Sequence, residues 1–213
     1  MKIAVSYSCG KDSALAFYKM KRAGHEPLCL IITVNEEAGR SWFHGVDYDL
    51  MEKVSKAIGL PIITSAGKGE DYNENFESAL AKAKKMGVQG CVFGDIDIAQ
   101  HLDWNQSRCG TVGLECIVPL WGQSRESVVV EFLGARFEAV IKCVDKKYLD
   151  AGFLGKTLDA ALVEKIGATG ADICGENGEY HTFVRNGPIF NEPVPTVLGE
   201  VVDFGSHAAI DIK

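Results

Sequence analysis

The sequence lacks the features that mark several common classes of protein. It has no apolar run near the roughly 18 residues that span a bilayer, and no internal repeat or low-complexity linker. Its seven cysteines include no Cys-x-x-Cys pair, which argues against a zinc ribbon and a disulfide framework. Acidic residues also outnumber basic ones, 29 to 22, which gives a net charge of −7. Broad, nonspecific binding to nucleic acid is therefore not expected.

What is present describes a soluble globular chain. The 213 residues are 46% hydrophobic and 24% charged, enough for one large domain or for a nucleotide domain with a smaller partner. A strand pattern begins at the first residues, so we expect no signal peptide or transit sequence. Scattered, reduced cysteines favour a cytoplasmic location.

The most informative segment is residues 1–13. An apolar run at 3–5 leads into a loop of small residues at 8–13, and an apolar helical pattern follows at once. This order directs backbone N–H groups and the positive end of a helix dipole at an anion. Small residues let the backbone approach closely, and Lys11 adds a mobile positive charge. The loop is therefore predicted to bind phosphate.

Two common kinds of phosphate loop can be excluded. A Walker loop needs a glycine where Val5 stands, and Asp12 follows the lysine. A dinucleotide fingerprint needs three spaced glycines, and only Gly10 is present. Residues 8–13 instead resemble Ser-Gly-Gly-x-Asp-Ser, the pyrophosphate loop of the adenine nucleotide alpha hydrolase superfamily, which implies cleavage of ATP between its α and β phosphates. Cys9 replaces the first glycine, and we expect a negative φ there because a positive φ costs about 1 kcal/mol or more.

Strands and helices alternate through the first 121 residues. Strands are predicted at 3–5, 28–34, 60–63, 88–93 and 116–119, and helices at 14–22, 47–58, 72–86 and within 98–109. The continuous apolar run at 28–34 is typical of a buried parallel strand. The spacing suits βαβ units. We therefore predict an α/β fold with a doubly wound, mostly parallel five-stranded sheet, Rossmann-like, as a nucleotide-binding domain of residues 1–121.

The rhythm changes beyond residue 121. A helix is predicted at 124–133, a strand at 137–144, a helix around 158–166, and antiparallel strands at 182–184, 189–190 and within 197–212. This pattern predicts a smaller α+β domain of residues 122–213 that binds the acceptor. Ligands of open α/β sheets bind at the carboxyl ends of the strands, so the cleft is expected where the second domain covers those ends.

Several residues follow predicted strands and become site candidates. Val34 ends the second strand, where an adenine or ribose could lie against the backbone. His44, in a turn at 42–45, is a candidate nucleotide contact, although a loop histidine is as often structural. Gly94 permits close approach of a ligand, and Asp95 could hold magnesium, orient an amine nucleophile or bind a cationic substrate. Asp97 suits the N-cap of the following helix better.

A second polar cluster occupies residues 175–182. Two glycines, two glutamates and a histidine lie within eight residues just before a predicted strand. Glu176, Glu179 and His181 could bind a divalent metal, or they could grip a cationic acceptor. The spacing alone leaves a solvated turn equally open.

Four segments then occur together in one order: residues 8–13, 93–96, 119–121 and 175–182. The same motifs recur in the diphthine–ammonia ligase family, which the chain resembles along nearly its full length. That family amidates diphthine, a modified histidine of a translation elongation factor, with ATP and ammonia, and releases AMP and pyrophosphate. The resemblance implies an ATP-dependent, AMP-forming ligase that uses free ammonium and a protein acceptor.

The resemblance also implies roles for the candidate residues. The nucleotide would contact Ser8, Cys9, Gly10, Lys11, Asp12, Ser13, Val34, His44 and Gly94. Catalysis would fall to Lys11, Asp12 and Asp95, with magnesium held by Asp12 against the departing pyrophosphate. The acceptor would contact Asp95, Glu176, Glu179, Tyr180, His181 and Thr182. Tyr180 or Trp121 could add a cation–π contact to the quaternary ammonium group of diphthine, worth about 0.5–2 kcal/mol.

Other functions stay open at this stage. A related ATP pyrophosphatase could thiolate RNA, with Cys109 or Cys116 carrying sulfur, although a cysteine in an apolar stretch is usually an inert core residue. The acceptor could instead be a small carboxylate. A protein that binds adenine nucleotide without turnover is a further alternative. The sequence also leaves a homodimer open.

Overall fold

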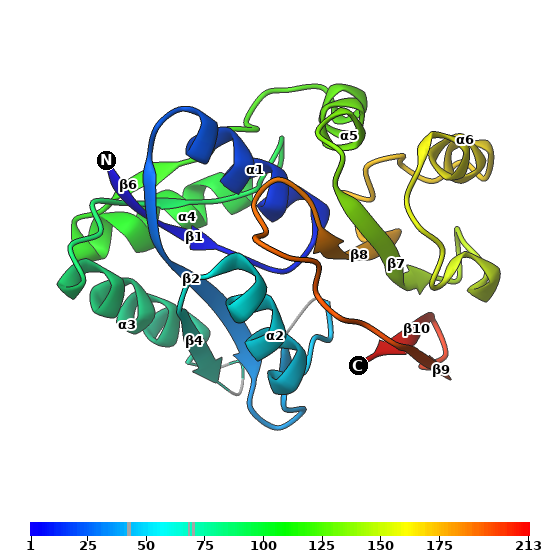
Figure 1. Ribbon diagram of the computed structural model, residues 1–213, viewed down its shortest axis with the longest axis horizontal. Helices are drawn as coiled ribbons and strands as arrows, with labels where there is room; N and C mark the ends of the chain where they lie inside the picture. Colours follow the sequence, from blue (N-terminus) through cyan, green and yellow to red (C-terminus); the bar gives the residue numbers. More distant parts are fainter. Residues whose placement is uncertain (42–43, 68, 70) are drawn as a thin grey trace.

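The computed structural model describes residues 1–41, 44–67, 69 and 71–213. Two sheets make up its framework, one mostly parallel and one antiparallel (Figure 1). The predicted turn at 42–45 is described only at His44 and Gly45, because Trp42 and Phe43 lie outside these ranges.

The first sheet contains the five parallel strands that the sequence predicts. They run in the order β4–β2–β1–β5–β6, with bounds β1 (Lys2–Ser6), β2 (Glu26–Asn35), β4 (Ile62–Gly67), β5 (Gly90–Val92) and β6 (Glu115–Ile117). A short strand, β3 (Arg40–Ser41), pairs antiparallel with the end of β2 and gives the sheet a sixth strand. Two residues carry no hydrophobic period, so β3 was not predicted.

Helices cover both faces of this sheet, which confirms the doubly wound fold. Alternate residues of β1 show the two faces: Ile3 and Val5 belong to one apolar cluster, and Ala4 belongs to the other. The first cluster also takes in side chains of α1 (Lys11–Arg22) and α2 (Tyr48–Ile58). The second takes in side chains of α3 (Tyr72–Lys85) and α4 (Ala99–Val112).

The second sheet is antiparallel, in the order β8–β7–β10–β9. Its strands are β7 (Glu138–Asp145), β8 (Tyr180–Asn186), β9 (Leu198–Asp203) and β10 (His207–Ile212). The helices α5 (Arg125–Gly134) and α6 (Ala160–Ala168) and the short 3-10 helix η1 (Ala151–Phe153) accompany them. No helix in the described ranges is both long enough and apolar enough to cross a membrane.

The strand predicted at 189–190 is wrong. Ile189 is fully buried, but Phe190 N donates to Gly187 O at 3.0 Å and closes a turn there. The two apolar side chains therefore mark a segment anchored in the core by its side chains.

The two sheets share one apolar core. Helix α1 lies where they meet (Figure 1), and Tyr18 of this helix contacts Phe137 edge-on, with 5.8 Å between ring centroids. Phe137 in turn stacks on Phe132 of α5 at 4.9 Å. Since buried side chains from both sides of residue 121 join the same cluster, the domain boundary at 121–122 stays a prediction.

Candidate functional site

A cavity of about 450 Å³ lies at the carboxyl ends of β1, β2 and β5 and is lined by residues of both halves of the chain. The loop after β1 contributes Ser8, Lys11, Asp12 and Ser13. The second half contributes Gly175, Glu176, Tyr180, His181 and Thr182. The structure thus brings the two polar motifs together, where open α/β sheets bind ligands.

The phosphate loop is closed on itself by small polar groups. Ser8 N donates to Ser13 Oγ at 3.2 Å, and the two hydroxyl oxygens lie 3.1 Å apart. Gly10 N donates to Ser8 Oγ at 3.2 Å, while Ser13 Oγ donates to Gly10 O at 3.0 Å. These contacts hold the loop in one shape, so an anion that bound there would meet a preorganised site and a smaller entropic cost of binding.

The expected negative φ at Cys9 is wrong, because its φ is +66°. The left-handed conformation costs about 1–2 kcal/mol for an ordinary residue. Two contacts offset that cost. The Cys9 side chain is fully buried in the core, and its carbonyl accepts a hydrogen bond from Val184 N of β8 at 2.8 Å. Burial raises the pKa of the thiol to about 12, so it stays protonated.

Two glycines permit close approaches around the loop. A Cβ at Gly94 would lie 2.7 Å from the backbone of Asp12 and Ser13, so β5 can end against the start of α1 only with glycine there. A Cβ at Gly10 would overlap the ring of His44. Gly94 therefore serves the approach of the protein backbone itself, in addition to any approach of a ligand.

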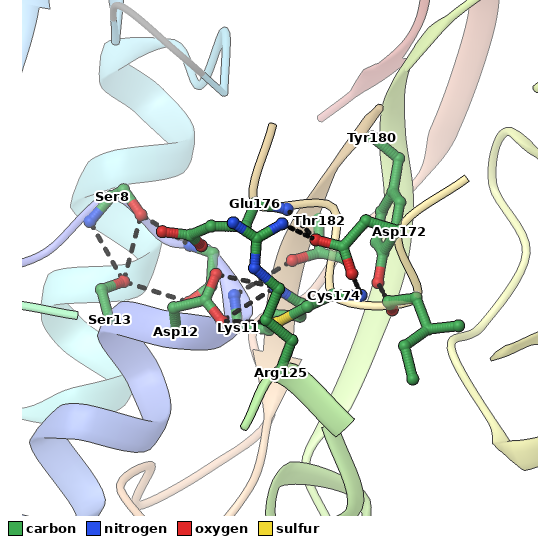
Figure 2. A network of polar contacts seen from close by, with 12 residues as sticks. Ser8, Lys11, Asp12, Ser13, Arg125, Asp172, Cys174, Glu176, Tyr180 and Thr182 are labelled. Carbon is green, nitrogen blue, oxygen red and sulfur yellow. Dashed lines mark hydrogen bonds and ion pairs between the residues drawn. The ribbon is translucent and has the colours of Figure 1, made fainter. Parts of the chain in front are cut away.

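Lys11 and Asp12 form an ion pair at the floor of the cavity. Lys11 is only 4% exposed, and its Nζ lies 2.8 and 2.7 Å from the two carboxylate oxygens of Asp12 (Figure 2). Burial opposes the charge of the ammonium group, but the neighbouring Asp12, Cys174 and Tyr180 outweigh it and raise the pKa of Lys11. Its Nζ also lies 5.8 Å from the centroid of the Tyr180 ring. Lys11 is therefore a fixed cation beside the loop.

Two further carboxylates line the cavity. Asp95 Oδ2 accepts a hydrogen bond from Asn105 Nδ2 at 2.6 Å, and Asp95 Oδ1 lies 3.1 Å from His101 Nδ1. Burial, then repulsion from Asp12, raises the pKa of Glu176 to about 7. This end of the cavity therefore carries an excess of negative charge that a cation would offset.

Asp97 does not cap α4, contrary to the prediction. Ile98 is the N-cap residue, and its side chain makes no cap hydrogen bond. The Asp97 carboxylate instead accepts from Arg125 Nε at 2.8 Å and from Arg125 Nη2 at 2.9 Å. A guanidinium that binds both oxygens competes well with a single backbone N–H.

Glu179 also departs from its predicted role. Its side chain is 3% exposed, and its carboxylate accepts from Asn177 N at 3.1 Å, Asn177 Nδ2 at 3.2 Å and Asp172 N at 3.4 Å. Among the described residues, those that line the cavity do not include Glu179. Glu179 therefore stabilises the fold of its own loop.

The remaining residues of the second motif face the loop. Thr182 Oγ1 accepts from Lys11 N at 3.0 Å, and Tyr180 OH donates to Ile173 O at 2.7 Å (Figure 2). His44 Nδ1 lies 2.8 Å from Thr182 O, and since a carbonyl only accepts, the proton sits on Nδ1. The ring of His181 lies 4.9 Å from that of His44. Burial lowers the pKa of His44 to about 3 and that of His181 to about 4, so both are neutral.

One wall of the cavity is aromatic and was not predicted from the sequence. Phe76 contacts Trp104 at 4.9 Å and Phe93 at 6.1 Å, and Tyr72 lies 5.6 Å from Trp104, measured between ring centroids. All four rings line the cavity. In the sequence they belong to the predicted helices at 72–86 and within 98–109 and to the predicted strand at 88–93, where nothing marked them as cavity residues.

Two predicted contacts lie elsewhere. Val34 is fully buried in the core, and among the described residues the lining at the end of β2 comes from Ile31, Ile32 and Thr33. Trp121 is 36% exposed, and the described lining does not include it. A role for Val34 would have to come from its backbone.

The described residues form no metal cluster by themselves. In the described part of the chain, no group of three or more His, Cys, Asp or Glu side chains is arranged to hold a metal ion, so Glu176, Glu179 and His181 do not form one. Magnesium commonly takes only one or two carboxylates, with substrate phosphates and waters. Asp12 beside the loop fits that pattern, and so does the excess of negative charge around Glu176.

The cysteines considered as sulfur carriers are not among the described residues that line the cavity. All seven cysteines are free thiols. Cys109 is buried in the cluster on the α3–α4 face of the sheet, and Cys116 packs against that cluster. Contact with Cys109, together with burial, raises the pKa of Cys116. Such a thiol is a poor nucleophile.

A parallel sheet with helices on both faces, a closed phosphate loop after β1 and a cavity at the strand ends together define a nucleotide-binding α/β protein. Residues 1–116 match the family model of the diphthamide synthase N-terminal domain, and residues 124–213 match that of the C-terminal domain. The first model alone covers more than half of the chain. The chain therefore belongs to the diphthamide synthase family, and the predicted enzyme class, a ligase, is confirmed.

Individual relatives agree with this membership. The diphthine–ammonia ligases of Bos taurus and Homo sapiens are each 25% identical over 233 residues, which is 98% of this chain and 87% of theirs.

A solved structure described as a predicted subunit of tRNA methyltransferase from Methanocaldococcus jannaschii covers 91% of this chain and 100% of its own, with 16% identity and a TM-score of 0.47.

Proposed function

We propose that this enzyme joins ammonia to the carboxylate of diphthine through an acyl adenylate, with ATP as the source of the adenylyl group. One observation carries the proposal: a closed pyrophosphate-type loop and the polar motif 175–182 line the same cavity. Supporting it, the chain is similar over nearly its whole length to proteins named diphthine–ammonia ligase.

The residues that line the cavity favour one orientation of the nucleotide. The aromatic wall offers Tyr72 and Trp104 as surfaces for the adenine ring, since rings stack on planar bases at 4.5–7 Å. The phosphates then reach the loop, where the hydroxyls of Ser8 and Ser13 and the ammonium of Lys11 face them. Magnesium, when bound by Asp12 and the phosphates, would neutralise charge on the departing pyrophosphate.

The reaction needs two steps. In the first, a carboxylate oxygen of diphthine attacks the α phosphorus, and the bond to the β phosphate breaks to release pyrophosphate. Lys11, held in place by Asp12, stabilises the charge that builds on the leaving group. In the second, ammonia attacks the acyl carbon, AMP leaves with the bridging oxygen, and a proton passes to solvent.

The acceptor carries a permanent positive charge, which suits the acidic end of the cavity. Glu176 supplies a carboxylate there, and Asp95, fixed by Asn105 at 2.6 Å, can orient the incoming amine. Tyr180 and His181 complete that side. The ring of Tyr180 already lies beside the ammonium group of Lys11, so it is only partly available for a cation–π contact with the acceptor.

The similarity to diphthine–ammonia ligases also supports a particular acceptor and location for this enzyme. The acceptor is a protein, the translation elongation factor that bears diphthine, and the enzyme works in the cytoplasm on free ammonium. Assembly as a homodimer stays a prediction.

A reconstituted reaction tests the proposal. The enzyme, ATP, magnesium and ammonium are mixed with elongation factor that bears diphthine, and with matched factor that lacks it. We expect AMP, pyrophosphate and a loss of about 1 Da from the factor, since a hydroxyl is exchanged for an amine, only in the first mixture. Equal AMP formation in both mixtures, or sulfur transfer to RNA in their place, would reject diphthine as the acceptor.

A further inference from the structure

Arg125 connects three segments that are far apart in the sequence. It is the first residue of α5, in the half of the chain that matches the C-terminal family model. Its Nε and Nη2 bind both carboxylate oxygens of Asp97, which follows β5, at 2.8 and 2.9 Å. Its Nη1 donates to Asp172 Oδ2 at 2.6 Å (Figure 2). The guanidinium thus joins the loop after β5 to the loop before β8.

Asp172 also binds the backbone at the start of the second motif. Its Oδ1 accepts from Cys174 N at 3.0 Å, and its Oδ2 accepts from Glu176 N at 3.2 Å (Figure 2). One carboxylate therefore holds two backbone N–H groups of the turn that presents Glu176 to the cavity. Asp172 is the better buried partner of Arg125, since its side chain is 13% exposed against 41% for Asp97.

The backbone of the phosphate loop is held by other contacts, although the side chain of Cys174, in the turn at 172–176, also reaches the loop, with Sγ 3.8 Å from Asp12 Oδ1. The loop backbone is fixed to β8 through Lys11 N and Thr182 Oγ1 at 3.0 Å, and through Val184 N and Cys9 O at 2.8 Å. The Arg125 contacts reach Glu176 and the β5–α4 loop that carries Asp95. Loss of Arg125 should therefore disturb the acidic end of the cavity and leave the backbone of the phosphate loop in place.

We propose that Arg125 is a positioning residue: by binding Asp97 and Asp172 together, it fixes the backbone of Glu176 relative to Asp95, and so sets the geometry of the acceptor end of the cavity. This role rests on the proposed function, because it assigns the affected step to the acceptor. An ion pair that merely tied the two halves together would affect stability alone.

The chain offers a matched control for that simpler role. Lys19 of α1 binds both carboxylate oxygens of Glu131 of α5, at 2.9 and 2.7 Å. This pair also joins the two halves of the chain through α5, but it does not touch the turn at 172–176. Lys19→Met thus removes a comparable cross-link without touching the proposed positioning contacts.

The test compares Arg125→Met, Arg125→Lys and Lys19→Met with the wild type. For Arg125→Met we expect kcat/KM for the diphthine-bearing factor to fall about 10- to 100-fold, while the Kd for ATP stays unchanged. Arg125→Lys keeps the charge but lacks the planar fork, so it should recover only part of the loss. Lys19→Met should retain the wild-type kcat/KM. Equal losses in Arg125→Met and Lys19→Met, or a matching loss of ATP affinity, would overturn the positioning role.

Amide hydrogen exchange separates this proposal from the proposed function. In Arg125→Met, the amides of Cys174 and Glu176 should exchange faster, and in Lys19→Met they should exchange at the wild-type rate. If wild-type enzyme shows no turnover of diphthine, the proposed function fails, and the exchange rates still decide whether Arg125 fixes the turn. Unchanged exchange in Arg125→Met would refute the positioning role whatever the substrate proves to be.

Discussion

Thr182 holds the start of α1 from the second sheet: its Oγ1 accepts a hydrogen bond from Lys11 N at 3.0 Å, although the two residues are 171 positions apart. Its carbonyl oxygen lies 2.8 Å from His44 Nδ1. One residue of the second motif therefore orders both the phosphate loop and the histidine that lies over Gly10. The two halves of the chain build the cavity jointly.

Replacement of Thr182 by valine should weaken ATP binding. The change keeps the shape of the side chain but leaves Lys11 N, a buried donor, without its acceptor, at a cost of about 1–3 kcal/mol. We expect a lower free energy of unfolding in urea and a higher Kd for ATP by titration calorimetry. Thr182→Ser keeps the hydroxyl and serves as control. Equal behaviour of the two variants would show that the hydrogen bond is unimportant.

Gly94→Ala should damage the loop more than a typical glycine substitution. The new Cβ would meet the backbone of Asp12 and Ser13 at 2.7 Å, so β5 or α1 must move, at about 1–3 kcal/mol. Gly110→Ala is the control, because no atom lies within 4 Å of a Cβ there and alanine favours the helix by about 1 kcal/mol. Thermal unfolding should show Tm lowered in the first and raised in the second. Equal Tm shifts in the same direction would argue against the close approach.

The ionisation of Glu176 should be visible in the pH dependence of stability. Burial and repulsion from Asp12 raise the pKa of this carboxyl to about 7 in the folded state, above the usual value near 4.3 of an unfolded chain. The stability that comes from the protonated form is complete below about pH 4.3 and is lost as the pH rises through 7.

The variant Glu176→Gln isolates this effect. The free energy of unfolding of the wild type, relative to Glu176→Gln, should decline between about pH 4.3 and 7. His44 and His181 have lowered pKa values and act with the opposite sign in both proteins, so the difference removes them. A flat difference across this range would mean that Glu176 is ionised throughout.

Serine replacements at Cys109 and Cys116 should leave ligase activity in place. Both thiols belong to or pack against the cluster on the α3–α4 face, and amide formation needs no thiol. We expect kcat within about threefold of the wild type, since the changes touch packing alone. Loss of all turnover in either variant would instead favour a sulfur-transfer chemistry.

The sequence predicted most of the first sheet, because its strands are continuous apolar runs and β1 leads directly into a recognisable loop. It failed where a distant partner decides the outcome. The positive φ of Cys9 depends on a hydrogen bond from Val184, and the orientation of Asp97 depends on Arg125. Neither partner is close in the sequence.

The site was predicted in part for a similar reason. A carboxylate in a polar loop has the same sequence pattern whether it lines a cavity, as Glu176 does, or binds its own backbone, as Glu179 does. Tyr72 and Trp104 were missed because aromatic residues at helical spacing usually indicate core packing. Only the packing of α3 against α4 turns them into a cavity wall.

The most direct test of the central claim follows oxygen from the acceptor. Elongation factor whose diphthine carboxylate carries ¹⁸O at both oxygens is converted with ATP and ammonium, and the products are examined by mass spectrometry. An acyl adenylate requires that the bridging oxygen leave with AMP, so we predict one ¹⁸O atom in each AMP formed. Label in inorganic phosphate, with ADP as the nucleotide product, would contradict the account and show activation through an acyl phosphate.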